Sequence, residues 1–415
     1  MGMTPEELAA ARERLEEFAA ELFAPLSRSD QRVKGETYLR GLLLDGRRKS
    51  MQPMAERLGV DHQGLQQFVS SSTWAVEPVR RRLAARAVEV IAPAAWVVDD
   101  TGFPKDGTAS PGVARQYCGS LGKVANCQIG VSVDAVTDVA SCPLDWRLFL
   151  PASWDDAGAA TPEAAAAIRA RRARAAIPDA ERHRPKWALA LEMLDELAGW
   201  GLTAPVVVAD AGYGNNADFR AGIATRGARY IVQVDGDLSA HPAEATPELK
   251  PYSGRGRRPR PRYRTRPVGL RAHALAAGRA ATVEITWRPG SRGSLTSHFL
   301  ALRVRPAGRN PTARLATDGS LPVVWLLAEW PPEVAEPTDY WLSDLPEDTP
   351  LPELVRLGKI RWRVEHDYRE LKTGLGLDHF EGRTFTGWHR HVTLVTAAQL
   401  FLTSLRHDPK VLVSA

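Results

Sequence analysis

The sequence predicts a mixed α/β protein that has an all-helical N-terminal region and a β-rich insertion. Apolar residues recur at helical spacing over residues 4–90. Short apolar runs that suit strands then alternate with amphipathic helical segments up to residue 239. Strand-like runs dominate the next part of the chain, and helical patterns return near its C-terminal end. The predicted boundaries of these four segments are 1–90, 91–239, 240–348 and 349–415.

Composition sets broad limits on size, charge and location. Hydrophobic residues make up 44% of the 415 residues, enough for a sizeable core in two or three domains. The net charge is +5 and the pI is about 9.2, a mild basic excess compatible with a polyanionic partner. Arginine supplies 45 of the 54 basic residues and lysine the other 9; a GC-rich genome explains this bias, which also suits phosphate binding. No apolar run is long enough to span a bilayer, so we expect a soluble intracellular protein.

Cysteine spacing predicts neither a metal site nor a disulfide framework. The three cysteines are Cys118, Cys127 and Cys142, and their separations match none of the usual patterns. We expect them to be ordinary small buried or half-buried residues.

The N-terminal segment contains a candidate helix-turn-helix. The stretch TPEELAAARERLEEFAAELFAPL has a capping-type start and apolar residues at helical spacing. In residues 50–74, Leu58 ends one predicted helix, Gly59 supplies the turn and Leu65 begins the next helix. Such a unit contacts DNA in some proteins and is purely structural in others, and the sequence leaves both interpretations open.

The second segment predicts the first part of a sheet with its helices. Expected strands lie at 94–100, 127–136, 141–150, 204–214 and 229–236. Expected helices lie at 186–201 and 216–227, with an Ala- and Arg-rich helical loop at 155–185. Their order is typical of a mixed α/β core.

The β-rich segment carries a strongly basic run. Residues 254–267 read GRGRRPRPRYRTRP, with Pro and Gly between the arginines. The strand-like runs that follow are ATVEITWRP, SHFLALRVRP, VVWLLAEW and DYWLSDLP. A charged helix is expected in IRWRVEHDYRELKTGLG at 360–376, and a last helix at 387–405.

Two acids stand at the ends of predicted strands. Asp100 ends the first strand and Asp210 ends the strand VVVAD. Acids at strand ends of an α/β sheet often point into the functional crevice, although each could simply cap the following turn. Together with an acid on a helix, they could hold two Mg²⁺ ions for phosphoryl transfer.

Helical periodicity selects one acid of the charged helix. At about 100° per residue, six residues form an apolar stripe. These are Leu357, Ile360, Val364, Tyr368, Leu371 and Leu375. Arg361, Glu365 and Lys372 lie beside this stripe within roughly 40° of one another, whereas Glu370 lies roughly 140° from Glu365 on the solvated face. Glu365 between two cations suits a site for metal and phosphate; the alternative is an exposed ladder of ion pairs that contributes little.

Three motifs together resemble a known family. They are WVVDDTGFPKDG, VVVADAGYG and IRWRVEHDYRELKTGLGLDHFEGRTFTGWHRH. The set resembles the DDE superfamily of transposases from bacterial insertion sequences, in particular the insertion sequence 701-like group. The resemblance covers nearly the whole chain and includes the segment LDWRLFLP.

This resemblance implies a ribonuclease H-like core in which two Asp and one Glu bind two divalent metal ions, Mg²⁺ with Mn²⁺ as a substitute. By motif, the three acids are Asp100, Asp210 and Glu365. Asp99 is an alternative to Asp100, because neighbouring strand residues point to opposite faces and the sequence does not choose between them.

Related cut-and-paste transposases carry a Tyr-Arg-Glu-Lys signature whose Tyr, Arg and Lys hold phosphates. Arg361 and Lys372 match the Arg and Lys offsets from Glu365, but the Tyr position is Gly358. This departure puts the Tyr–phosphate contact in doubt and leaves a hairpin intermediate open.

The resemblance also implies DNA contacts from the insertion. Trp362, Trp325 and Trp341 are candidates for base stacking, with burial in the core as the alternative for each. The basic run is expected to order on DNA phosphates, or else to be a solvated loop. Its arginines are Arg255, Arg257, Arg258, Arg260, Arg262, Arg264 and Arg266. We expect His389 and His391 to be structural and not metal ligands.

The resulting hypothesis is a transposase that binds terminal repeats and target DNA, both double-stranded, as a homodimer. We expect it to be cytoplasmic, and nucleoid-associated when bound. One alternative is a ribonuclease H-fold nuclease without strand transfer. The other is a catalytically idle DNA-binding protein derived from a transposase.

Overall fold

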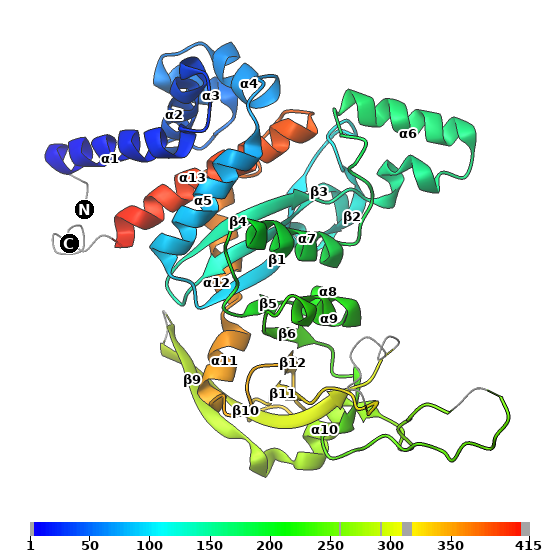
Figure 1. Cartoon of the computed structure of the whole chain (residues 1–415). Helices are drawn as coiled ribbons and strands as arrows, with labels where there is room; N and C mark the ends of the chain where they lie inside the picture. The colour runs from blue at the N-terminus through cyan, green and yellow to red at the C-terminus, as the bar shows by residue number, and fades with distance from the viewer. Residues whose placement is uncertain (1–3, 257–258, 291–292, 309–317, 408–415) are drawn as a thin grey trace. The chain divides into compact units, whose positions relative to one another are not determined.

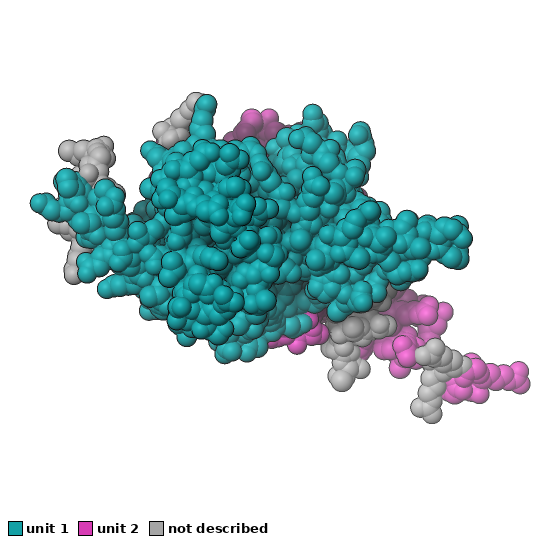
Figure 2. Space-filling view, turned by 90° about the horizontal axis from the view of Figure 1, so that it is seen from above, with its two compact units in different colours: residues 1–93, 99–202, 363–415 teal, residues 94–98, 203–362 magenta. Residues whose placement is uncertain are grey.

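A computed structural model describes residues 4–256, 259–290, 293–308 and 318–407. The chain divides into two compact units, which Figure 2 colours separately. Unit 1 contains residues 1–93, 99–202 and 363–415, and unit 2 contains residues 94–98 and 203–362. Within the described residues, no helix combines the length and apolarity that crossing a membrane requires. The mixed α/β fold class is confirmed, whereas the four-segment division stays a prediction.

The N-terminal part of unit 1 is helical, as predicted (Figure 1). Its helices are α1 Pro5–Phe23, α2 Ser29–Leu43, α3 Met51–Leu58, α4 His62–Ser70 and α5 Val76–Ile91. Thr4 caps α1 in a reciprocal capping box with Glu7. The predicted turn between α3 and α4 is also present, because Gly59 adopts a left-handed conformation with φ of 67°. Whether this helix pair contacts DNA stays a prediction.

The sheet of unit 1 is built around one long strand. β3 (Lys123–Val136) pairs antiparallel with β2 (Ala114–Cys118) through its first residues and with β4 (Ser141–Leu148) through its last. The second half of β1 (Ala95–Pro104) follows β3 in the strand order β2-β3-β1. β2 was missing from the predicted strands; it has only five residues, and Cys118 is the one that is fully buried.

Helices pack on β4 through residues that alternate along the strand. Trp146 donates from its indole nitrogen to Thr396 Oγ1 of α13 (Phe385–His407) at 3.1 Å. The preceding residue, Asp145, is fully buried and pairs with Arg80 of α5 at 2.8 Å. Neighbouring residues of a strand point to opposite faces, so α13 and α5 are held by different sides of β4.

The Ala- and Arg-rich stretch of unit 1 is more regular than predicted. It contains α6 (Pro162–Arg174), and α7 (Lys186–Gly199) follows as expected. Two short 3₁₀ turns, Ala152–Trp154 and Asp156–Gly158, precede α6. Arg171 lies 3.6 Å from the Trp154 ring, which ties α6 to the first of these turns.

Unit 2 contains one sheet with the strand order β1-β5-β6-β12-β11-β10-β7-β8, and β9 pairs with β10. The first residues of β1 run parallel to β5 (Val207–Ala209), which runs parallel to β6 (Tyr230–Val234). The remaining strands are β7 Ser239–Pro242, β8 Val268–Gly269, β9 Val283–Gly290, β10 Gly293–Pro306, β11 Val324–Glu329 and β12 Asp339–Ser343. Its helices are α8 Ala211–Gly214, α9 Ala217–Thr225, α10 Leu270–Ala277 and α11 Leu351–Lys359.

The predicted strands of the insertion are present, and they extend an existing sheet. β12 pairs antiparallel with β6, so Tyr340 lies opposite Val234 and Ser343 opposite Ile231. The short runs at the start of the insertion also pair, since β7 lies between β10 and β8. The β-rich segment is therefore continuous with the parallel strands of unit 2.

The charged C-terminal segment forms two helices where the sequence predicted one. α11 ends at Lys359 and α12 (Trp362–Thr373) begins after a turn at Ile360 and Arg361. Gly358 and the β-branched Ile360 both have low helix propensity, which favours a break at this point. The predicted apolar stripe nevertheless holds, because all six of its residues are at most 7% exposed.

Gly214 provides a test of the close packing between α8 and β6. A Cβ atom at Gly214 would lie far inside van der Waals contact with the backbone oxygen of Gln233. We predict that Gly214→Ala lowers the free energy of unfolding by on the order of 2 kcal/mol, because the helix has to move away from the strand. Urea denaturation measures the change. Gly199→Ala is the control, since nothing lies within 4 Å of its Cβ position, and equal stability of the two variants would contradict the close approach.

Candidate active site

The two acids of β1 have different surroundings. Asp99 is 6% exposed, and its Oδ1 accepts a hydrogen bond from the backbone N–H of Asp100 at 2.8 Å. The side chain of Asp100 is 21% exposed, and its Oδ2 lies 2.8 Å from Lys186 Nζ. Asp100 is therefore the more accessible of the two carboxylates, consistent with the sequence motif.

Lys186 was not among the predicted site residues. It is the first residue of α7, and its side chain is 39% exposed next to Asp100. No local sequence signal could have placed it there, because 86 residues separate it from its partner along the chain.

A buried hydrogen bond anchors α12 to the sheet of unit 1. The Tyr368 hydroxyl and Ser132 Oγ of β3 are 2.5 Å apart, and Ser132 also donates to Asp134. Burial raises the pKa of both Tyr368 and Asp134 well above their ordinary values. Ser132 and Asp134 alternate with apolar residues in GVSVDAV, a polar pattern in a buried strand that could have identified this anchor.

Glu365 is exposed on α12, three residues before Tyr368. Lys372 lies seven residues, or about two turns, after Glu365 and so on the same side of the helix. Its Nζ donates to the Gly102 carbonyl of β1 at 2.7 Å, and desolvation lowers its pKa. The side of α12 that carries Glu365 therefore faces the part of β1 that follows Asp100.

The structure changes the interpretation of two signature positions. Arg361 lies in the turn before α12, so the helical spacing assumed for it from Glu365 does not apply. Gly358 lies inside α11, where an added Cβ would already touch Leu327, Ile231 and Trp341 at 3.4–3.6 Å. A tyrosine ring at position 358 would have no room, which gives a steric reason for the departure from the signature.

Asp210 follows β5 and caps α8. Its Oδ1 accepts a hydrogen bond from the Tyr213 N–H at 3.3 Å, and its side chain belongs to unit 2. The capping role that the sequence left open is thus present. A cap oxygen satisfies a backbone donor, and a carboxylate has a second oxygen for another ligand.

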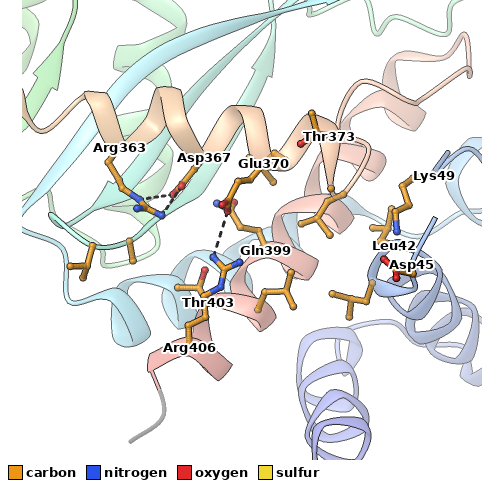
Figure 3. Close-up of a pocket in the computed structure, with 17 residues that line it drawn as sticks. Leu42, Asp45, Lys49, Arg363, Asp367, Glu370, Thr373, Gln399, Thr403 and Arg406 are labelled. Atoms are coloured by element: carbon orange, nitrogen blue, oxygen red, sulfur yellow. Dashed lines mark hydrogen bonds and ion pairs between the residues drawn. The ribbon is translucent and has the colours of Figure 1, made fainter. Parts of the chain in front are cut away.

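A different cluster on α12 brings together His366, Asp367 and Glu370. One potential ligand atom from each lies within 4.8 Å of the others. Asp367 is also bound by Arg363 at 2.7 Å and by Ser141 at 2.5 Å, and Glu370 lies 3.5 Å from Arg406 (Figure 3). Both carboxylates therefore already have arginine partners.

The Arg363–Asp367 pair borders a cavity of about 310 Å³ in unit 1. Figure 3 shows it between α12, α13 and the end of α2. Gln399 lines this cavity, and its buried Oε1 has no hydrogen-bond partner among the described residues. The helical wheel correctly placed Glu370 on the solvated face. It did not single out buried Asp367, although the i,i+4 spacing of Arg363 and Asp367 indicates an ion pair on the helix.

The three candidate tryptophans differ in exposure. Trp341 is 4% exposed and belongs to the core, the alternative that the sequence left open. Trp325 is partly exposed, with Arg303 Cζ at 4.6 Å from its ring. Trp362 is also partly exposed, and Arg288 Cζ lies 3.5 Å from its ring.

The basic run is exposed but attached to unit 2. Tyr263 stacks on His241 with 4.4 Å between ring centroids, and its hydroxyl accepts from the Leu321 N–H at 2.8 Å. Arg264 pairs with Glu248 at 3.1 Å. The exposed arginines of the run are Arg255, Arg260, Arg262, Arg264 and Arg266. Arg257 and Arg258 lie outside the described residues.

The histidines after the charged helix are structural, as predicted. His389 Nδ1 lies 3.0 Å from the Phe385 carbonyl. His391 lies 3.0 Å from both the Tyr38 hydroxyl and the Gly376 carbonyl, and burial lowers its pKa to about 4. The contacts of His391 use both ring nitrogens, the atoms that would bind a metal.

The cysteines are buried, as predicted, and their thiols are free. Cys118 and Cys127 pack with Ile129 in a small apolar cluster. Burial raises the pKa of Cys127 to about 12, so its thiol is protonated at neutral pH.

Comparison with known proteins decides the family. Residues 21–294 match the model of the DDE superfamily endonuclease family, which is more than half of the chain. The chain belongs to this family. A curated relative is the probable transposase for insertion sequence element IS701 from Microchaete diplosiphon, 27% identical over 179 residues. The matched part spans 42% of this chain and 41% of that protein, so the chain spans less than half of the length of the relative.

The family match contains Asp100 and Asp210, but it ends before α12. Family membership implies use of divalent metal ions. Asp100 and Glu365 offer carboxylate oxygens, the ligands that Mg²⁺ prefers, and neither side chain is fully buried. Lys186 pairs with Oδ2 of Asp100, and a carboxylate has a second oxygen that can serve as a metal ligand.

Burial of His391 makes the stability of the protein depend on pH. Its pKa is about 4 in the folded state against about 6.5 when unfolded, so the unfolded chain binds the proton more tightly. We predict that its contribution is fully present above pH 6.5 and is lost as pH falls towards 4, by on the order of 3 kcal/mol. Urea denaturation from pH 7.5 to 4.5 should show a flatter profile for His391→Gln. The exposed His62→Gln serves as control, and an unchanged profile in His391→Gln would contradict the buried neutral ring.

Proposed function

We propose that the protein is a DDE transposase that binds the terminal repeats of an insertion sequence, cuts the DNA and joins it to a target. The observation that carries this proposal is the position of two acids at the ends of paired parallel strands. Val98 of β1 pairs with Ala209 of β5. Asp210 follows Ala209 directly, and Asp100 follows Val98 by two residues, so each of the two paired parallel strands leads along the chain into one of the acids.

In this proposal Asp100, Asp210 and Glu365 hold two Mg²⁺ ions, and Mn²⁺ can substitute. Bound there, the ions would supply a nucleophile from water or a 3′-hydroxyl and neutralise charge on the phosphate. The protein contributes positioning: α12 presents Glu365 on the side that Lys372 ties to β1. Arg361 and Lys372 contact phosphate near the scissile bond, and Trp362 provides an aromatic surface for DNA.

The proposed DNA partner is double-stranded, both as transposon ends and as target. The helix pair α3–α4 and the exposed arginines of the basic run would supply most contacts outside the site. We propose that two copies act together on two ends. The similarity to a probable transposase for an insertion sequence element supports the proposed binding to DNA.

One experiment distinguishes the proposed transposase from a nuclease of the same fold and from an inactive DNA-binding protein. A nuclease of the same fold would cut DNA without joining it to a target. A DNA-binding protein without activity would bind and leave the DNA intact with Mg²⁺ or Mn²⁺. Incubating the purified protein with DNA that flanks its gene and with a target plasmid, with Mg²⁺ and then with EDTA, distinguishes all three.

We predict that Glu365→Gln abolishes cleavage and leaves DNA binding intact, because the substitution removes a metal-binding charge and keeps the side-chain volume. The expected loss is at least on the order of a thousand-fold in the cleavage rate. Rates are measured on end-labelled flanking DNA and binding by gel shift.

Glu370→Gln is the matched control on the same helix, because Glu370 lies on a different side of α12 from Glu365 and Lys372 and pairs with Arg406. This variant should cut at nearly the rate of the unmodified protein. Normal cutting by Glu365→Gln together with loss in Glu370→Gln would overturn the assignment of Glu365. Asp210→Asn extends the test to the second unit and should also bind without cutting.

We also predict that removing charge from the basic run weakens binding to unrelated DNA sequences equally. A variant with Arg255, Arg260, Arg262 and Arg266 changed to Gln should have a slope of log affinity against log salt that is smaller by about 0.9 for each phosphate it no longer neutralises. Fluorescence anisotropy at several salt concentrations measures this slope. Arg264 is kept because it pairs with Glu248, and weaker binding to one DNA sequence alone would contradict a backbone role.

A further inference from the structure

A β-bulge turns two neighbouring side chains of β9 towards the same segment. In the pairing with β10, Leu295 lies opposite Arg288 and Thr296 opposite Thr286, so Trp287 is an extra residue on β9. Neighbours in a regular strand point to opposite faces. Here the Trp287 ring lies 5.3 Å from Lys359 Nζ and Arg288 Cζ lies 3.5 Å from the Trp362 ring. The bulge therefore allows both residues to contact the end of α11 and the start of α12.

Arg288 has no anion partner among the residues that the structure describes. It is partly buried, its guanidinium is close against the Trp362 indole, and its Nε is buried without a hydrogen bond. Within the same described ranges, no group forms an ion pair or side-chain hydrogen bond with its guanidinium. Arginine stays charged at all relevant pH values. A partly desolvated charge without a partner is costly, which points to an external anion as the partner.

Two other stacked cations of unit 2 have acceptors for their donors, whereas Arg303 beside Trp325 has only the Val323 carbonyl at 3.4 Å and two buried nitrogens without a partner among the described residues. Arg279 lies 4.8 Å from the Trp330 ring and donates to the carbonyl oxygens of Pro331 and Val334. Lys359 lies near three aromatic rings and pairs with Glu329. Arg279 and Lys359 therefore have acceptors in addition to their aromatic partners, whereas Arg288 has no hydrogen-bond acceptor or anion among the described residues.

We propose that Arg288, held against Trp362, binds a backbone phosphate of DNA. A guanidinium stacked on an indole keeps its N–H donors in its own plane, where two of them can meet the oxygens of one phosphate. Trp362 acts as a positioning residue that fixes this plane. The inference rests on the proposed function. It adds Arg288 of β9 to the DNA contacts that are proposed for the basic run and for α12.

The test measures binding of a short fluorescent DNA duplex of arbitrary sequence to the full chain by anisotropy at several salt concentrations. Arg288→Ala should raise Kd about ten-fold at low salt and reduce the salt slope by about 0.9, the value of one phosphate contact. Arg288→Lys should keep the slope and bind more weakly, because lysine retains charge but not the planar fork. Trp362→Leu should also keep the slope with a several-fold higher Kd.

Arg279→Ala is the matched control, since it removes a stacked arginine whose donors are satisfied within the protein. Its slope and Kd should equal those of the unmodified chain. Thermal melting of each variant verifies folding, and Arg288→Lys keeps the test valid where the alanine variant fails to fold. An unchanged slope in Arg288→Ala, with normal binding by the unmodified protein, overturns the phosphate site and leaves the proposed function standing. Failure of the unmodified protein to bind DNA at any salt concentration overturns both.

Discussion

The hydrogen bond between Tyr368 and Ser132 is the interaction on which the geometry of the candidate site depends. It joins α12 to the middle of β3 in a buried environment, where Asp134 completes the network. Buried polar groups are stabilising only when all are satisfied, and such a network therefore specifies one arrangement of the helix. Because Glu365 lies one turn before Tyr368, its position on unit 1 follows from this anchor.

Neutralisation of charge explains much of the surrounding structure. Lys186 accompanies Asp100, Arg363 accompanies Asp367, and Lys359 accompanies Glu329. Each pair ties a helix to another element or stabilises the helix that carries it. Lys372 is tied to β1 through a carbonyl, and this hydrogen bond orients the side of α12 that bears Glu365. Against this background, Arg288 is informative because its stack on Trp362 has no accompanying anion among the described residues.

The insertion has a structural consequence beyond its basic run. Its strands continue the sheet of unit 2, so α11 rests on a surface formed by β6, β11 and β12 around Gly358. A glycine stands where the signature has a tyrosine, and it allows the helix to approach the sheet. Gly358 thus accounts both for the close packing of α11 on the sheet and for the lack of a tyrosine hydroxyl at this position.

Local patterns in the sequence determined the N-terminal helices, most of the strands and the buried stripe from Leu357 to Leu375. They also identified Asp100 and Asp210 as acids at the ends of predicted strands. These features depend on neighbours within a few residues, through periodicity and capping. The sequence did not predict β2, the break between α11 and α12, or the partners of Asp100, Asp367 and Trp362. Those were decided by tertiary structure, because Lys186 lies 86 residues from Asp100 and Ser141 lies 226 residues from Asp367. No spacing rule connects such residues; only the packing of sheet and helices brings them within hydrogen-bonding distance.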